Sequence, residues 1–222
     1  MLIRSGLSAV ALFLFIFAPT PVRAQLPDPT DTQQWNEVQL AIPLTKTVDF
    51  NLLGVLRIGR DISRPVDERI GVAFTFKIGE HLSVQPGYIN IGMQPFEGRK
   101  VWESRLVLPV TVRFPVGKFR VSDRNTFERR IRRPGINSTR YRNKLQIEHP
   151  FGPKRLNLSA FVSDEVFYDW SLDDWVRNRF QAGVSRVFNR HFTGDLWYMR
   201  QNDGRSIPGD LHIIGTSFRF RL

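Results

Sequence analysis

Two consecutive stretches between Arg120 and Phe151 alternate strongly polar residues with mainly apolar ones. A period of two residues over this length indicates extended strands, each with one charged face and one mainly apolar face. The dipeptide Pro134-Gly135 separates the stretches and indicates a turn, so we expect the two strands to be neighbours. The polar positions are Arg120, Ser122, Arg124, Thr126, Glu128 and Arg130 in the first stretch, and Arg140, Arg142, Lys144, Gln146 and Glu148 in the second.

These charged faces limit the folds that are open to the chain. Burying a sheet of ionic side chains in a dry core would cost too much free energy, so either bulk water or a polar interior must cover them. Other segments repeat the alternation, with an apolar face such as Ile70, Val72, Phe74 and Phe76 opposite polar residues. Alternation alone does not distinguish a barrel with lipid outside from one with a dry core, so further features must decide.

The first residues have the pattern of an export signal. Arg4 precedes an apolar run at 7–18, which is too short to span a bilayer comfortably. Val22 and Ala24 are small residues at cleavage-site spacing, so we expect a signal peptide over 1–24 that is removed before Gln25. An N-terminal membrane anchor is the alternative. Cleavage would remove two arginines and no acid, lowering the formal charge from +11 to +9.

The mature chain is expected to be one β-barrel domain at 34–222, behind an irregular leader at 25–33 rich in Pro, Asp and Thr. No later segment is long and apolar enough for a membrane helix, so a membrane-spanning chain would have to form a closed barrel. Strand-like segments lie at 34–43, 47–58, 68–78, 81–91, 100–114, 118–131, 138–149, 155–168, 175–188, 191–201 and 210–222. Because bacterial single-chain barrels use even strand numbers, we predict an all-β fold, an antiparallel transmembrane β-barrel of about 10–12 strands.

The connections and the aromatic residues favour an outer-membrane barrel. Short connections such as 44–46 and 115–117 alternate along the chain with longer ones such as 60–67, 92–99 and 202–209. Tight turns at one end and longer loops at the other are typical of bacterial outer-membrane barrels. Five aromatic residues lie mostly near strand ends, where the aromatic girdles of a membrane interface are found. Ordinary packing is the better explanation for any single one of them. The five residues are Trp102, Trp170, Trp175, Trp197 and Tyr198.

Several stretches resemble a bacterial family known as domain of unknown function 2490, namely QQWNEVQLAIPL, SDRNTFERRIR, STRYRNKLQIEHPF, SDEVFYDW, WVRNRFQAGVS and YMRQNDGRSIPGDLHIIGTSFRFRL. The resemblance covers nearly the whole mature chain. It implies an outer-membrane β-barrel with no settled activity, and it adds no catalytic residues. The last five residues are similar to the closing strand that barrel assembly machinery recognises, except that Leu222 replaces the usual terminal Phe.

Ionic residues on the polar faces are the best candidates for a function. We predict a lumen charge network of Glu103, Arg105, Arg124, Glu128, Arg142, Lys144, Glu148, Glu165, Arg177 and Arg179. In one interpretation, salt bridges fill a narrow lumen by joining Arg124, Arg142 and Lys144 to Glu128, Glu148 and Glu165. In the other, surplus arginines line a water-filled path that favours small anionic solutes. Barrels of about eight strands are filled by side chains and open channels appear at about sixteen, which favours the filled lumen.

Catalytic and metal chemistry find little support in the sequence. Cysteine is absent and the four His residues are scattered, so we expect no metal and no other cofactor. His81 and Ser83 have no evident orienting partner, so chance explains them better than a nucleophile and its base. Acidic residues at 169, 173 and 174 fit a solvated loop tip better than a cation site. We therefore assign no catalytic residues.

The overall prediction is an outer-membrane protein of a Gram-negative bacterium, in contact with outer-membrane lipid and with the barrel assembly machinery. It would act as a narrow anion-favouring pore or as a structural barrel. An outer-membrane enzyme acting on lipid and a soluble periplasmic β-barrel carrier remain alternatives. Nucleic acid is not expected as a partner, because the arginines alternate along strands with Glu residues instead of forming a patch interleaved with exposed aromatics.

Overall fold

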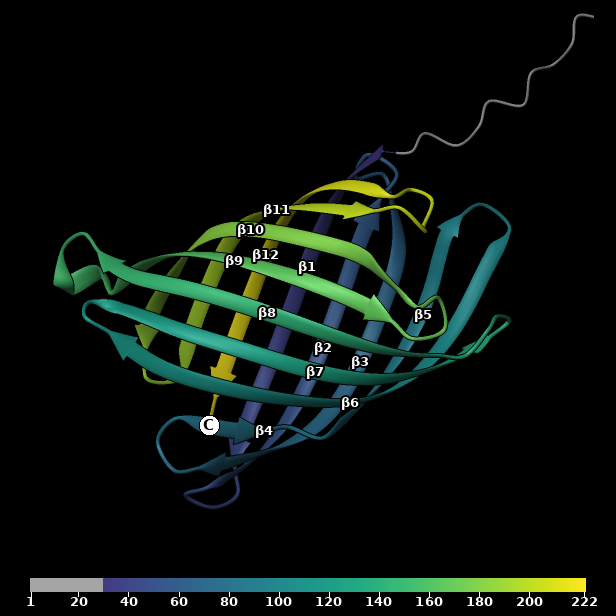
Figure 1. The fold of residues 1–222 in the computed structure, drawn as a ribbon. Coiled ribbons are helices and arrows are strands. Elements are labelled where there is room, and N and C mark those ends of the chain that lie inside the picture. Colours follow the sequence, from purple (N-terminus) through teal and green to yellow (C-terminus); the bar gives the residue numbers. More distant parts are fainter. Residues whose placement is uncertain (1–29) are drawn as a thin grey trace, which may run out of the picture.

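The structure, a computed structural model, describes residues 30–222, and at 95 and 96 it describes the backbone alone. These residues form a closed β-barrel, which confirms the predicted fold class (Figure 1). The strands are β1 (Thr30–Pro43), β2 (Val48–Gly59), β3 (Arg64–Ile78), β4 (Leu82–Val84), β5 (Gly87–Phe96), β6 (Arg99–Val116), β7 (Phe119–Arg133), β8 (Ser138–Phe151), β9 (Leu158–Asp169), β10 (Asp174–Asn189), β11 (Phe192–Asp203) and β12 (Asp210–Arg221). A short 3-10 helix, η1 (Lys154–Leu156), precedes β9. Within these residues, no helix has the length and apolar character needed to cross a membrane.

Strands β4 and β5 occupy one position in the barrel. Both lie between β3 and β6, and the register is continuous across them, with Val84 opposite Phe76 and Gly87 opposite Ala73. Pro86 lies in the short break between them, where it has no N–H to donate to a ladder. The barrel therefore has eleven strand positions, inside the predicted range, and the even number expected of bacterial barrels does not hold here.

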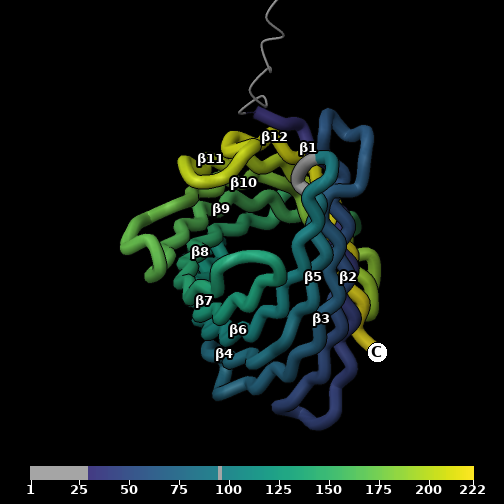
Figure 2. Tube along the Cα trace, turned by 90° about the vertical axis from the view of Figure 1, so that its right-hand side faces the viewer, coloured from purple at the N-terminus to yellow at the C-terminus, as the bar shows by residue number. Residues whose placement is uncertain are grey.

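The barrel closes through a parallel pair of strands. β1 lies beside β12, with Thr30 opposite Asp210 and Ala41 opposite Arg221, and Figure 2 shows the two strands together. An odd number of positions requires one parallel pair when the other neighbours are antiparallel, because the first and last strands then run in the same direction. β1 thus starts at one rim, named here the N-rim, and β12 ends at the other, named the C-rim.

The two rims have connections of similar length, so the predicted difference between short turns and longer loops is wrong. Connections at both rims have two to six residues. β3 begins at Arg64, where we expected a loop up to residue 67, and β5 continues to Phe96. The polar residues of these segments resembled loops, but strands that line a polar interior accommodate them. Asp67, for example, is buried and belongs to β3.

The expected irregular leader at 25–33 overlaps with β1, which begins at Thr30. Pairing with β12 extends to that residue. Farther along the strand, Gln33 and Trp35 turn inward, and Trp35 Nε1 donates to Gln33 Oε1 at 2.7 Å. These contacts hold 30–33 in the strand. The expected signal peptide and the rest of the leader lie outside the described residues.

Apolar side chains cover much of the outer wall. Ile70 is 74% exposed and Leu106 is 54% exposed. Soluble monomers rarely expose contiguous apolar surfaces larger than a few hundred Å². The exposed residues include most of the apolar faces seen in the sequence, namely Val38, Leu52, Ile70, Val72, Phe74, Phe76, Leu106, Leu108, Val112, Phe114 and Val162.

A polar patch interrupts this wall on β7 to β10. Asn143 Nδ2 donates to Asp123 Oδ1 at 2.6 Å and to Asn125 Oδ1 at 3.1 Å. Asn178 Nδ2 donates to Asp164 Oδ1 at 2.9 Å. These five residues face outward, because their immediate neighbours along each strand line the lumen. The outer wall is therefore mainly apolar, and this patch is the polar group that spans β7 to β10.

Aromatic residues gather near both rims of the outer wall. Towards the N-rim, Trp170 stacks on Phe127 with ring centroids 6.2 Å apart. Towards the C-rim, Phe192 stacks on Phe188 and on Phe220, each at 4.9 Å. Aromatic groups near both ends of an apolar wall are the arrangement of membrane-interface girdles.

Candidate functional site

The inward faces of the strands enclose a strongly basic cavity of about 750 Å³. Its lining includes twelve Arg or Lys and six Asp or Glu side chains, which gives a net charge of +6. Nine of the ten residues predicted for the lumen network line it, and Glu103 is buried inside the barrel beside it. The period of two explains this placement, because residues of one parity on each strand share a face.

Glu103 anchors the part of the lumen nearest the N-rim. Its side chain is fully buried and accepts hydrogen bonds from three arginines. The donors are Arg105 Nε at 2.7 Å, Arg130 Nη2 at 3.0 Å and Arg132 Nε at 2.9 Å. Arg105 follows Glu103 on β6, and the other two come from the facing positions of β7. Such charge-assisted bonds offset the desolvation of a buried carboxylate.

Arg142 connects two further buried glutamates across neighbouring strands. Its Nη1 donates to Glu128 Oε1 at 2.7 Å, and its Nε donates to Glu165 Oε1 at 3.0 Å. Arg140 donates to the other oxygen of Glu128 through Nε at 3.0 Å and Nη2 at 2.7 Å. Arg179 Nη1 lies 3.6 Å from Glu165 Oε2. The three buried glutamates therefore organise one continuous ionic network.

Phe167 fills the space between the guanidinium groups of this network. Its side chain is fully buried, and four guanidinium carbons lie 4.8–5.5 Å from the centroid of its ring. Cations close to an aromatic face are attracted by the quadrupole of the ring. The four residues are Arg140, Arg142, Arg177 and Arg179. Ion pairs and one aromatic ring thus narrow the N-rim half of the lumen, where residues such as Arg130 and Arg140 also line the cavity.

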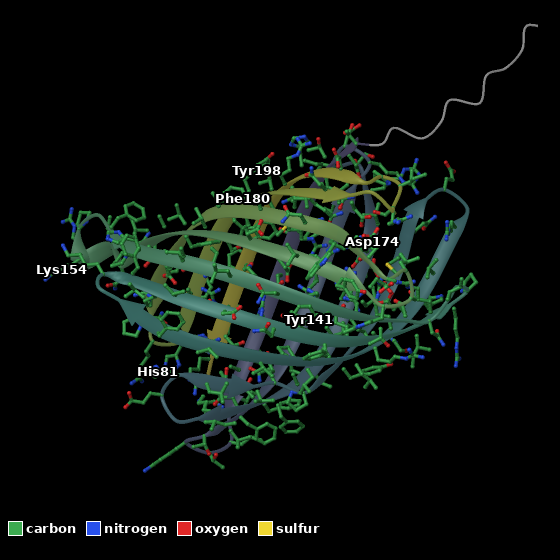
Figure 3. The ribbon with its side chains drawn as sticks, in the orientation of Figure 1. His81, Tyr141, Lys154, Asp174, Phe180 and Tyr198 are labelled. Carbon is green, nitrogen blue, oxygen red and sulfur yellow. The ribbon has the colours of Figure 1, made fainter. Side chains whose placement is uncertain are left out.

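Two tryptophans pack against each other inside the barrel. Trp35 and Trp197 meet edge to face with ring centroids 6.3 Å apart. Gly215 makes room for the second ring, because a Cβ at that position would lie 2.1 Å from Trp197 Cζ2. Trp197 therefore does not belong to an interface girdle, in line with the alternative of ordinary packing, because its face of β11 turns inward. Its neighbour Tyr198 does lie on the outer wall (Figure 3).

The C-rim half of the lumen contains three cations in a different setting. Arg124 and Lys144 face each other directly across the ladder between β7 and β8. Lys144 Nζ donates to Gln181 Oε1 at 2.9 Å, and Arg113 Nη1 donates to Ser83 Oγ at 3.2 Å. Over residues 30–222, none of the three cations lies within 4.0 Å of a carboxylate oxygen.

The expected pairing of the lumen charges holds only in part. Arg142 pairs with Glu128 and with Glu165. Glu148 instead pairs with Arg120, which is largely exposed near the C-rim. The alternation of residues identifies the face of a strand on which a charged side chain lies. The ion-pair partner of that side chain depends in addition on the stagger of neighbouring strands and on side-chain rotamers.

Several acids of the lumen are absent from the predicted network, and two of them, Asp67 and Asp203, pair with inward arginines. Asp67 Oδ1 accepts from Arg69 Nε at 2.6 Å, and Asp203 Oδ2 accepts from Arg177 Nε at 2.6 Å. Both acids lay in segments that we expected to be loops. Asp67 lies two residues before the inward Arg69, and Asp203 lies directly opposite the inward Arg177. Such positions next to an inward arginine would have identified both acids as lumen residues.

The other chemical candidates do not converge in the structure. Ser83 faces the lumen and bonds to Arg113, while His81 is exposed at the rim (Figure 3). Asp169 accepts from Ser171, and Asp174 pairs with Arg205 at 2.8 Å. In the part of the chain that the structure describes, no group of three or more His, Cys, Asp or Glu side chains could hold a metal ion.

Comparisons with known proteins give one match at the level of the family. The model of the family described as "Protein of unknown function (DUF2490)" matches residues 32–211. A comparison with curated proteins gives no match.

Two solved structures are similar to this chain at low sequence identity. The first is LpxR from Salmonella typhimurium, with a TM-score of 0.49 and 9% identity over 78% of this chain and 83% of that protein. The second is an anion-selective porin from Comamonas acidovorans, with a TM-score of 0.41 and 12% identity over 79% of this chain and 54% of the porin. The family match extends over most of the 222 residues and agrees with the stretches that carry the resemblance, so the chain belongs to the DUF2490 family.

Proposed function

We propose that this protein is an outer-membrane β-barrel that favours small anions in a narrow, largely filled lumen. The observation that carries the proposal is the lumen cavity, whose lining has a net charge of +6 and whose N-rim part is narrowed by ion pairs. A positive, low-dielectric cavity concentrates anions and excludes small cations. The narrowed part limits the flow of ions, so a low conductance is expected.

The outer wall supports a location in the membrane. A strand can cross a bilayer only if its backbone groups are paired inside the protein, and a closed barrel meets this condition. The continuous ladder around the barrel leaves no open edge. Apolar side chains face outward with aromatic groups near both rims, as lipid requires.

Fractionation of cells tests the location directly. The mature protein should sediment with outer membranes, require detergent for extraction and migrate differently on gels before and after boiling. A protein that is released with the soluble periplasmic fraction would contradict the membrane proposal and favour a carrier.

A charge on the outer wall tests which face meets lipid. Val110 lies on the outward face of β6. An Arg on the lipid face at mid-bilayer raises the free energy of the inserted barrel by about 2–4 kcal/mol, so Val110→Arg should impair assembly. Gln146→Arg is the matched control, because it adds the same charge to the cavity lining. Equal assembly of the two variants would show that the face of β6 is assigned incorrectly.

Recording of single channels in planar bilayers tests the lumen. We expect a conductance that is small or below detection, with an anion preference wherever current is measurable. A large, steady, cation-preferring conductance would contradict both the narrowed part and the positive cavity.

A lipid-acting enzyme is the second candidate, and the polar patch of Asp123, Asn125, Asn143, Asp164 and Asn178 favours it. Ionisable residues within a membrane are costly and usually mark functional sites. The test is incubation of the purified barrel with outer-membrane lipid, followed by mass spectrometry of the lipid. A modified lipid that disappears with Asp164→Asn would favour the enzyme over the pore.

A further inference from the structure

We propose that Arg113, Arg124 and Lys144 form a binding site for a phosphate-class oxyanion in the C-rim half of the lumen. This inference rests on the proposed function, and it adds the residues and the chemical class of the bound anion. The site lies on three consecutive strands, β6, β7 and β8, and its residues line the cavity of about 750 Å³.

The register of the strands brings the three cations together. Arg124 on β7 is directly opposite Lys144 on β8. Arg113 on β6 is opposite Ser122, the inward residue that precedes Arg124 on the same face of β7. All three side chains therefore enter the lumen from adjacent positions of one face.

No acid of residues 30–222 forms an ion pair with these cations, and Glu165 and Glu37 act on Arg124 and Lys144 only from a longer distance. Glu165 is the cross-strand neighbour of Lys144, but its carboxylate bonds to Arg142 and approaches Arg179. Glu148 pairs with Arg120. Within the described residues, the remaining charge of the three cations is available to a ligand.

Glu37 is the acid that faces the same cavity from β1. Its Oε1 accepts a hydrogen bond from Gln39, and no ion pair within 4.0 Å joins it to a basic side chain of residues 30–222. Counting Glu37 against the three cations still leaves a net charge of +2 around this part of the cavity. A phosphate dianion would match that charge.

The arrangement also suits the shape of the proposed ligand. Like charges directly opposite each other on neighbouring strands destabilise a sheet, and an anion between them would remove that repulsion. Guanidinium groups match the oxygens of phosphate, and an ammonium adds a point charge. The cavity volume lies within the range of roughly 300–1,000 Å³ that is usual for ligand sites, so a small oxyanion fits with its water.

The test is titration calorimetry of the detergent-purified, full-length barrel with inorganic phosphate at near-physiological chloride. Arg124→Gln and Lys144→Gln should each weaken phosphate binding at least tenfold, while Lys144→Arg should retain most of it. Arg219→Gln is the matched control, because this lumen arginine already pairs with Asp195 at 2.6 Å. The affinity of this variant for phosphate should stay within about twofold of wild type. Heat-modifiable migration on gels verifies that each variant is folded.

Glycerol 3-phosphate in a second titration distinguishes the source of the ligand. Comparable binding of both probes supports a site for free phosphate, and binding of glycerol 3-phosphate alone supports a phosphomonoester or a lipid headgroup. Absence of binding for both probes, or unchanged binding in Arg124→Gln, would overturn the site.

The proposed function is judged by a separate measurement, the reversal potential in a chloride gradient. An anion preference without phosphate binding would refute the site and leave the proposed function in place. A cation preference would refute the proposed function, whatever the calorimetry shows.

Discussion

The two halves of the lumen contain the same kinds of side chain, but they differ in how the cations are paired with acids. In the N-rim half, Arg130 and Arg140 surround buried glutamates at hydrogen-bond distance. In the C-rim half, Arg124 and Lys144 face each other without a carboxylate partner among the described residues. The comparison shows that the positions of the acids, rather than the number of arginines, decide whether this lumen is filled or receptive to anions.

The difference separates stability from ligand binding along one barrel. Buried charges that are fully hydrogen-bonded are costly to break, because removal of one partner leaves the other charge in a low dielectric. Cations without acid partners add little to stability and attract anions. Substitutions at equivalent positions of the two halves should therefore have effects of different size and even of different sign.

The largest effect is expected for Glu128→Gln in the N-rim half. This change leaves Arg140 and Arg142 without one of their carboxylate partners, and the loss of one member of a buried network costs about 3–5 kcal/mol. Urea unfolding of the barrel reconstituted in lipid vesicles measures the change. A midpoint equal to that of wild type would show that the N-rim half is solvated and not filled.

The next largest effect is expected at the interior tryptophan pair. Gly215→Val would drive a side chain into the ring of Trp197, and such overpacking costs typically about 1–3 kcal/mol. Unfolding followed by tryptophan fluorescence measures both the stability and the displacement of the ring. Gly54→Ala serves as the control, because a Cβ at that position has no atom within 4 Å.

A smaller effect is expected for Glu148→Ala in the C-rim half. Its partner Arg120 is largely exposed, and surface ion pairs contribute at most about 1 kcal/mol. Loss of this acid should move the reversal potential further towards anions, because the lining becomes more positive. A loss of stability as large as that of Glu128→Gln would abolish the distinction between the two halves.

The smallest effect, with the opposite sign, is expected for Arg124→Gln in the absence of phosphate. Relief of the repulsion with Lys144 should stabilise the barrel by roughly 0.2–1 kcal/mol, the range of cross-strand pair energies. The urea midpoint should rise slightly in a buffer without phosphate. A clear fall would mean that Arg124 has a stabilising partner and that the C-rim half resembles the other half.

The sequence predicted the strands and their faces well, because a period of two is a direct consequence of strand geometry. The segment expected at 100–114, for example, is β6 at Arg99–Val116. The connections were predicted less well, because polar strand ends that face a polar lumen resemble loops. The interruption between β4 and β5 at Pro86 was not predicted either. It depends on how these strands pair with β3 and β6, and a local sequence pattern does not contain this information.

The alternation of residues along each strand predicted which side chains face the lumen. It did not predict which of these side chains form ion pairs with each other. Glu103 and Glu165 were placed on polar faces, yet the alternation did not indicate that Arg132 or Arg179 would reach them. Those contacts depend on the stagger around the barrel and on rotamers of long side chains. For the same reason, no pattern in the sequence separated the paired arginines from Arg113 and Arg124.

The parallel contact of β1 with β12 has a consequence for the order in which the barrel forms. It joins positions as far apart in the chain as Thr30 and Asp210, so its loop-closure entropy is the largest among the neighbouring pairs. Parallel ladders are also slightly less stable per residue than antiparallel ones. We therefore expect the ladder between β1 and β12 to form last during folding. We also expect its hydrogen bonds to open locally before those of the other ladders in the native state. Amide hydrogen exchange should show faster exchange along this ladder than along the ladder between β7 and β8, and equal protection factors would contradict this order.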